Sequence, residues 1–189
     1  MSLDIPLFRS VCLEGLESRW FMASDGQSPF TGKPADLLLG ETIEFENFDN
    51  GGEGVAYHDT DAQNVGSSYR SNEGVDVEPS GDTGGGLNVG YAKASEWLIY
   101  SLNVANPGMF GIQVRVASLK GGGKFHFEID GKTVASFTVP NTGNWQKYVT
   151  LSSAKNISLS AGQHALRLVM DGNDSTGYVA NFNWMKVVS

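Results

Sequence analysis

The fold prediction rests on the pattern of one segment, Phe125-His126-Phe127-Glu128-Ile129-Asp130-Gly131. Apolar side chains at positions 125, 127 and 129 alternate with polar ones at 126, 128 and 130, as in a strand that is buried on one face. The Asp130-Gly131 pair is typical of a two-residue hairpin turn. We therefore expect an antiparallel hairpin whose second strand covers residues 133–139.

Similar alternation recurs along the chain, over residues 43–46, 98–104, 112–116 and 166–170, and residues 181–188 are expected to form the last strand. The composition includes 24 glycines, which is typical of many tight turns between short strands. The sequence therefore predicts an all-β protein, built as a β-sandwich or a barrel.

The 189 residues are enough for one domain and a tail, and we expect the boundary near residue 40. Residues 1–40 are interpreted as an N-terminal leader or linker. Within them, Leu13–Met22 is compatible with a short helix, and residues 25–36 contain Gly, Pro and Ser that interrupt both helix and strand patterns. The β-sandwich is expected over residues 41–189.

The formal net charge is −8 and the isoelectric point is about 4.8. Such a surface repels nucleic acids and anionic membranes, and it favours a neutral ligand or a cation such as calcium. No apolar run reaches the length of a membrane span, and no signal peptide is visible at the start of the chain. The single cysteine, Cys12, excludes an intrachain disulfide.

The stretch Gly74–Tyr100 joins a glycine-rich turn, Gly84–Gly86, to two aromatic residues, Tyr91 and Trp97. Glycines remove side-chain bulk and permit positive φ, so we expect this turn to pass close to a ligand. Three acidic residues lie just before the glycine-rich turn, namely Asp76, Glu78 and Asp82. The stretch contains no obvious nucleophile, base or phosphate cradle. It indicates a surface that holds something flat and hydroxylated rather than one that breaks bonds.

Several ordered blocks of this chain resemble the family 6 carbohydrate-binding modules over roughly residues 41–189. They are I-E-F-E-N-F-D-N-G-G-E-G-V-A-Y-H-D-T-D, Y-R-S-N-E-G-V-D-V-E, D-T-G-G-G-L-N-V-G-Y, E-W-L-I-Y-S-L-N-V, V-P-N-T-G-N-W-Q-K-Y, A-G-Q-H-A-L-R-L and N-F-N-W. The resemblance implies a two-sheet jelly roll that binds glycans without catalysis. Such modules are usually attached to secreted or cell-surface glycoside hydrolases that act on plant or algal polysaccharides.

The resemblance also implies a sugar site in the loops at one end of the sandwich. Tyr91 and Trp145 match the two aromatic residues that flank a sugar ring, and Glu78 and Asn181 match the residues that bind its hydroxyls. Flat aromatic rings lose water together with the C–H face of a pyranose and lose little side-chain entropy. An amide both donates and accepts, and a carboxylate makes charge-assisted bonds to hydroxyl groups.

Trp97 belongs to a separate hypothesis. The apolar stripe of the 98–104 segment runs through Leu98, Tyr100 and Leu102, so Trp97 should face the opposite side. In some family members an aromatic residue at this place lines a second cleft on a sheet face. The alternative is a tryptophan packed under a loop.

Glu44 and Glu46 are two residues apart on the first expected strand and should share one face, where their charges would repel each other. Calcium takes 6–8 oxygen ligands and would relieve this repulsion. The family resemblance implies a structural calcium between the first and last strands, with Asn183 where an aspartate is common. Two solvated glutamates on an edge strand are the alternative.

Two other functional classes stay open at this point. A small glycoside hydrolase would need two opposed carboxylates in a cleft, and no acid of this chain stands in a recognisable catalytic motif. A calcium-stabilised adhesion or cell-surface module would need no exposed aromatic pair. We therefore expect a binding module rather than an enzyme, and its ligand is left open among xylan, agar-type galactans and β-glucans.

Overall fold

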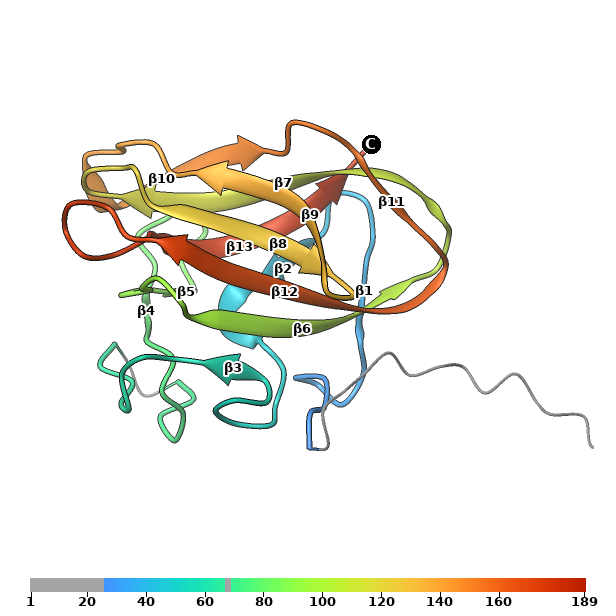
Figure 1. Ribbon diagram of the computed structural model, residues 1–189, viewed down its shortest axis with the longest axis horizontal. Helices are drawn as coiled ribbons and strands as arrows, with labels where there is room; N and C mark the ends of the chain where they lie inside the picture. Colours follow the sequence, from blue (N-terminus) through green and yellow to red (C-terminus); the bar gives the residue numbers. More distant parts are fainter. Residues whose placement is uncertain (1–25, 67–68) are drawn as a thin grey trace, which may run out of the picture.

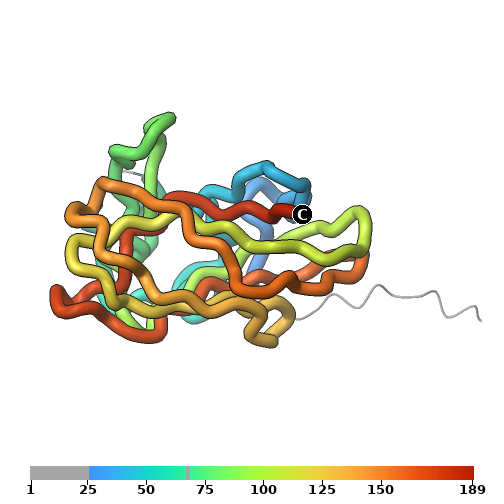
Figure 2. The backbone as a smooth tube through the Cα atoms, turned by 90° about the horizontal axis from the view of Figure 1, so that it is seen from above, coloured from blue at the N-terminus to red at the C-terminus, as the bar shows by residue number. Residues whose placement is uncertain are grey.

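The computed structural model describes residues 26–66 and 69–189. The expected helix at Leu13–Met22 and the lone Cys12 lie outside these residues. Among the described residues there is no helix long and apolar enough to cross a lipid bilayer. Strands dominate, and they form two sheets that pack face to face, so the prediction of an all-β, two-sheet jelly roll is confirmed (Figures 1 and 2).

The first sheet has six strands in the order β1-β6-β12-β8-β9, with β3 paired to β6. Of its strand pairs among the described residues, only β1–β6 is parallel. Its strands are β1 (Ala35–Asp36), β3 (Tyr57–His58), β6 (Trp97–Val104), β8 (Lys124–Ile129), β9 (Lys132–Thr138) and β12 (Gly162–Gly172).

The second sheet has seven strands in the order β10-β7-β13-β5-β4, with β11 paired to β7 and β2 paired to β13. Its strands are β2 (Thr42–Glu44), β4 (Val77–Pro79), β5 (Leu87–Val89), β7 (Gly108–Ser118), β10 (Asn144–Ser152), β11 (Ile157–Leu159) and β13 (Asn181–Val188). The connection between β12 and β13 lies at the same end of the sandwich as β4 and β5 (Figure 1, left).

The predicted hairpin is present. Ile129 pairs with Lys132 across the turn, and Asp130 and Gly131 have φ of 51° and 73°. Positive φ at both central residues is what a type I′ turn requires. The local twist of this turn matches the twist of the flanking strands, which explains why seven residues of sequence were sufficient to predict it.

Aromatic rings from both sheets form the centre of the core. Phe182 of β13 meets Phe125 of β8 at a centroid distance of 5.0 Å, and it meets Phe45 at 5.8 Å. All three side chains are fully buried. Because side chains alternate along a strand, an anchored Phe182 also fixes the direction of its neighbour Asn181 at the loop end of β13.

The first expected strand is shorter than the sequence predicted. The alternation over residues 43–46 suggested a strand through Glu46, but β2 ends at Glu44 and a 3₁₀-helix, η1 (Phe45–Asn47), follows. Phe45 and Phe48 are both fully buried. A 3₁₀ turn brings residues three apart to one face, so it lets both rings enter the core where a strand would not. Glu46 is consequently buried rather than exposed.

Residues 26–40, which their composition assigned to a leader or linker, are docked on the sandwich. Ser28 and Asn50 exchange main-chain hydrogen bonds of 2.9 and 2.8 Å, and the Asn50 Nδ2 donates to the carbonyls of Pro29 and Phe30. β1 then pairs with β6, and Leu37 is buried. The packed module therefore begins before residue 41.

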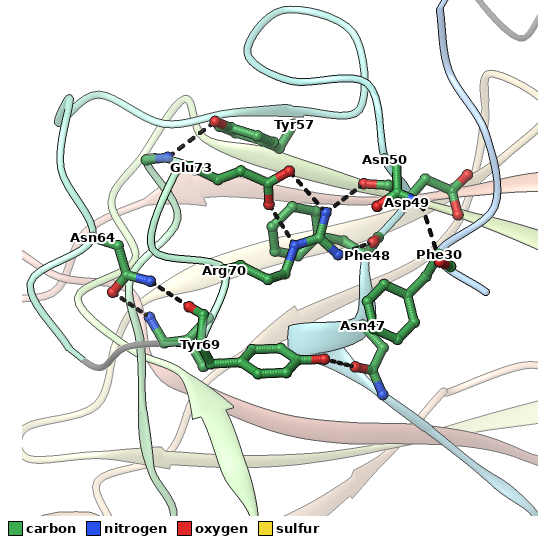
Figure 3. Close-up of polar contacts among 12 residues, drawn as sticks. Phe30, Asn47, Phe48, Asp49, Asn50, Tyr57, Asn64, Tyr69, Arg70 and Glu73 are labelled. Carbon is green, nitrogen blue, oxygen red and sulfur yellow. Dashed lines mark hydrogen bonds and ion pairs between the residues drawn. The ribbon is translucent and has the colours of Figure 1, made fainter. Parts of the chain in front are cut away.

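Arg70 joins this N-terminal segment to the long loop that precedes β4 (Figure 3). Its guanidinium lies 3.6 Å from the centroid of the Phe48 ring and 5.2 Å from that of Phe30. It donates to the main-chain carbonyls of Phe48 and Asp49, and it pairs with the carboxylate of Glu73. One cation thus holds three segments that are distant in sequence.

Candidate functional site

A pocket of about 170 Å³ opens at the loop end of the sandwich, lined by Glu78, Tyr91, Trp145, Gln146, Tyr178 and Asn181. All four side chains predicted for the sugar site are among these six. They come from β4, from the β5–β6 connection and from the starts of β10 and β13. The fold therefore brings together residues that lie up to 103 positions apart in the sequence.

Three aromatic rings form the walls. The Tyr178 ring stands perpendicular to both others, with centroid distances of 5.9 Å to Tyr91 and 5.9 Å to Trp145. Tyr91 is 41% exposed and has a φ of 52°. A non-glycine residue in this left-handed region is uncommon and is most often found where the surroundings enforce it, as at ligand sites. The wall residue Tyr91 is thus held in an unusual conformation with its ring accessible.

The carboxylate of Glu78 is oriented by three amide groups. Its Oε1 accepts hydrogen bonds from the side-chain nitrogens of Asn181 (2.6 Å), Gln146 (2.9 Å) and Asn88 (3.3 Å). Its Oε2 has no hydrogen-bond partner among the described residues. A Cβ at Gly90 would lie only 3.0 Å from Oε1, so glycine leaves room for the carboxylate. Oε2 is therefore the oxygen available to accept a bond from a hydroxyl group.

Asn181 links the other members of the pocket. Its Nδ2 donates to Glu78 and also to the main-chain carbonyl of Trp145 at 3.0 Å. Tyr148 lies beside it, and burial raises the pKa of this phenol to about 12, although hydrogen bonds with Ser80 and Asn181 oppose the rise. Asn181 thus fixes the relative placement of Glu78 and Trp145, a role that the sequence interpretation, which assigned it to hydroxyl binding, did not include.

Two lining residues, Gln146 and Tyr178, were missed in the sequence. Gln146 directly follows Trp145 at the start of β10, and Tyr178 follows Gly177 in a polar loop. A glycine followed by a tyrosine is also the local pattern at Gly90-Tyr91, and that signal could have identified Tyr178. No local signal distinguishes Gln146, because its role depends on Glu78 reaching it from another strand.

The glycine-rich turn does not have the expected role. Gly84, Gly85 and Gly86 have φ of 102°, 72° and 88°, so the expected positive φ is present. However, none of the three lines the pocket, and a Cβ at any of them would meet nothing within 4 Å. Glycine is needed here for the backbone conformation of the β4–β5 connection. Close approach to a ligand is not supported.

The three predicted metal ligands, Glu44, Glu46 and Asn183, lie in β2, η1 and β13. Glu46 is buried, its Oε2 has no hydrogen-bond partner in the described part of the chain, and burial together with the nearby charge of Glu44 raises its pKa to about 7. An unsatisfied buried carboxylate oxygen fits a hard cation. Asn183 donates its Nδ2 to Asp82 of the β4–β5 connection at 2.9 Å. Within residues 26–66 and 69–189 there is no group of three or more His, Cys, Asp or Glu placed to hold a metal.

Trp97 faces away from the core, as its position in the alternation predicted. It is half-buried, while Leu98, Tyr100 and Leu102 are buried on the inner side. The guanidinium of Arg167 lies 4.4 Å from the centroid of its ring, and the His58 ring lies 6.4 Å away. Trp97 does not line the pocket, and the Arg167 guanidinium already covers part of its ring.

Comparisons with known proteins agree with this geometry. The model of "Carbohydrate binding module (family 6)" matches residues 65–189. The "Clotting factor G alpha subunit" of Tachypleus tridentatus is 30% identical over 123 residues, which are 64% of this chain and 17% of that protein. The "Beta-agarase AgaA" of Microbulbifer thermotolerans is 27% identical over 101 residues, which are 52% of this chain and 22% of that protein. The chain thus spans about a fifth of the length of these relatives.

A solved structure is similar over nearly its whole length. It is the carbohydrate-binding module CBM6cm-2 from the Cellvibrio mixtus lichenase 5A, in complex with cellotriose. The identity is 29%, the TM-score is 0.58, and the match covers 80% of this chain and 98% of that one. Together with the family match over most of the sequence, these findings show that the chain belongs to family 6 of the carbohydrate-binding modules.

Proposed function

We propose that this module binds a plant or algal polysaccharide by holding a pyranose unit in the pocket between Tyr91 and Trp145. The observation that carries the proposal is the convergence of accessible aromatic walls with a carboxylate oxygen, Glu78 Oε2, that has no partner among the described residues. The rings take the C–H face of the sugar, and the carboxylate accepts from its hydroxyl rim.

A panel of polysaccharides tests the proposal. Xylan, agarose and β-glucans are the candidate ligands, and one relative is an agarase while a similar module was solved with cellotriose. We expect millimolar to micromolar affinity for at least one of them, which corresponds to roughly 4–8 kcal/mol. Affinity electrophoresis and a glycan array measure this, and incubation should release no reducing sugar. Absence of retention on every glycan, or sugar release that follows the purified protein, contradicts the proposal.

The module is further proposed to direct an attached glycoside hydrolase of an exported protein to its substrate. The relatives support this, since the chain matches about a fifth of a β-agarase. Sequencing of the gene on both sides of the module tests the attachment, and a flanking region without any catalytic domain would contradict it.

A structural calcium ion is proposed at Glu44, Glu46 and Asn183. The support is the buried Glu46 Oε2, which has no hydrogen-bond partner within residues 26–66 and 69–189, beside a second carboxylate. Bound calcium would neutralise this pair and join the first strand to β13. We expect a chelator to lower the melting temperature and added calcium to restore it, because the ion binds only the folded state.

The calcium prediction has an internal control. In the Glu46→Gln variant the buried charge is absent, so the chelator should change the melting temperature little. Calorimetric melts of both proteins, with and without chelator, provide the comparison. Identical melts of the wild type in the two conditions would remove the calcium proposal.

The second cleft at Trp97 is retained as a proposal of its own. Its support is the outward, half-buried position of the ring on the six-stranded sheet. A glycan that binds there must share the ring with Arg167. Titration calorimetry of the wild type would then report two sites and of Trp97→Ala one site. Equal stoichiometry in both proteins would contradict the second cleft.

A further inference from the structure

The β4–β5 connection is fastened to the outer face of the seven-stranded sheet by an ion pair. Arg115 of β7 donates from Nε and Nη2 to the two carboxylate oxygens of Asp82, both at 2.7 Å. Asn183 of β13 adds a bond of 2.9 Å to the same carboxylate. The Asp82 side chain is 5% exposed. A part-buried fork-to-carboxylate pair of this kind fixes direction as well as distance.

The residue before Asp82 connects this anchor to the pocket. The main-chain N–H of Gly81 donates to the Gln146 Oε1 at 2.7 Å, and the Gln146 Nε2 donates to Glu78 at 2.9 Å. A Cβ at Gly81 would lie 3.1 Å from the Cβ of Gln146, so the two residues are tightly packed. The position of Gly81 therefore determines how the amide of Gln146 is presented to the carboxylate.

Apart from the ion pair and the Gly81–Gln146 bond, the connection has main-chain bonds from the Ser80 N–H to the Gly86 carbonyl and from the Gly85 N–H to the Asp82 carbonyl, both at 3.0 Å, which join it only to itself. A hydrogen bond between Ser80 and Tyr148 is a further link to the sheet. β4 and β5 contain three residues each, and β5 joins the rest of the sheet through the pairing of Val89 with Phe182. The segment between them contains Gly84, Gly85 and Gly86 at positive φ, and glycine is the residue with the greatest backbone freedom. Loss of the ion pair should therefore loosen this segment, and Gly81 would move with it.

We propose that Arg115 and Asp82 are positioning residues for glycan binding, acting on Glu78 through Gly81 and Gln146 although neither lines the pocket. The proposal rests on the pocket being the glycan site. It differs from a merely structural role because it predicts that the effect on affinity passes through one identified side chain, Gln146.

A double-mutant cycle on glycan affinity tests the proposal. In the otherwise wild-type module, Arg115→Ala should weaken binding of the retained glycan at least fivefold. In the Gln146→Ala background, where the connection is already broken, the same change should weaken binding less than twofold. Arg115→Lys should give an intermediate loss, because lysine keeps the charge but cannot make the two parallel bonds. Titration calorimetry supplies all the dissociation constants.

Lys186→Ala is the matched control, since it removes one positive charge from the outer face of the same sheet, where Lys186 lies against Trp184. It should leave the affinity unchanged. Thermal melts establish that each variant is folded, and Arg115→Lys replaces Arg115→Ala in the cycle if the latter unfolds. Equal losses in the two backgrounds, or unchanged affinity in the first, overturn the inference alone. A wild type that binds no glycan overturns both the inference and the proposed function.

Discussion

Trp145→Ala is expected to abolish retention of the module on the polysaccharide that the wild type binds. The change removes one of the aromatic walls of the pocket and the partner of the perpendicular Tyr178 ring. Truncation of an aromatic residue at the centre of an interface typically weakens binding by at least about 2 kcal/mol, or roughly 30-fold. Applied to a ligand held in the millimolar to micromolar range, this loss removes visible retardation in affinity electrophoresis.

Trp184→Ala provides the matched control for this prediction. Trp184 is half-buried on the outer face of the seven-stranded sheet, beside Lys186, and it does not line the pocket. Its removal should leave retention intact, whereas Tyr91→Ala should reproduce the loss seen with Trp145→Ala. Undiminished retention of both Tyr91→Ala and Trp145→Ala would show that the glycan binds elsewhere.

Arg70→Ala is expected to lower the free energy of unfolding by about 3–5 kcal/mol, because removal of one partner from a buried ion pair leaves the other charge uncompensated. The Arg70 side chain is 8% exposed. Its loss would leave the Glu73 carboxylate and the carbonyls of Phe48 and Asp49 without their donor. For a domain of this size the melting temperature should fall by ~10 °C, which differential scanning calorimetry measures.

Two further variants test whether the loss of stability comes from the guanidinium of Arg70. Arg70→Lys should recover only part of the loss, since an ammonium group cannot donate to both carbonyls and the carboxylate in the same planar geometry. Lys132→Ala, at an exposed position of β9, should change stability by no more than about 0.5 kcal/mol. A change below about 1 kcal/mol in Arg70→Ala would refute the role assigned to this cation.

Local sequence was sufficient to predict those parts of the fold that are determined by residues close together in the chain. The Phe125–Gly131 segment specifies both a strand and its turn, and the alternation after Trp97 correctly predicts which side of β6 enters the core. The convergence of Glu78 with Asn181 was different. It was expected from family resemblance alone, because no local pattern states that β4 lies beside the start of β13.

The features that the sequence did not predict are those decided by tertiary contacts. The strand pattern at Glu44–Glu46 gave way to a 3₁₀-helix because Phe45 and Phe48 both reach the core. Residues 26–40 have the composition of a linker, yet Arg70 and Asn50 supply the contacts that hold their first part in place. Gln146 has no distinguishing neighbour in sequence, and only its contacts with Gly81 and Glu78 identify it.

The central claim is that the loop-end pocket, rather than either sheet face, binds the glycan. The most direct measurement is the response of the indole N–H resonances of the four tryptophans during an NMR titration with the retained oligosaccharide, assigned through single Trp→Phe variants. The account predicts that the Trp145 resonance shifts and saturates with the dissociation constant found by calorimetry. A saturating shift of Trp97 or Trp184 with Trp145 unchanged would contradict it.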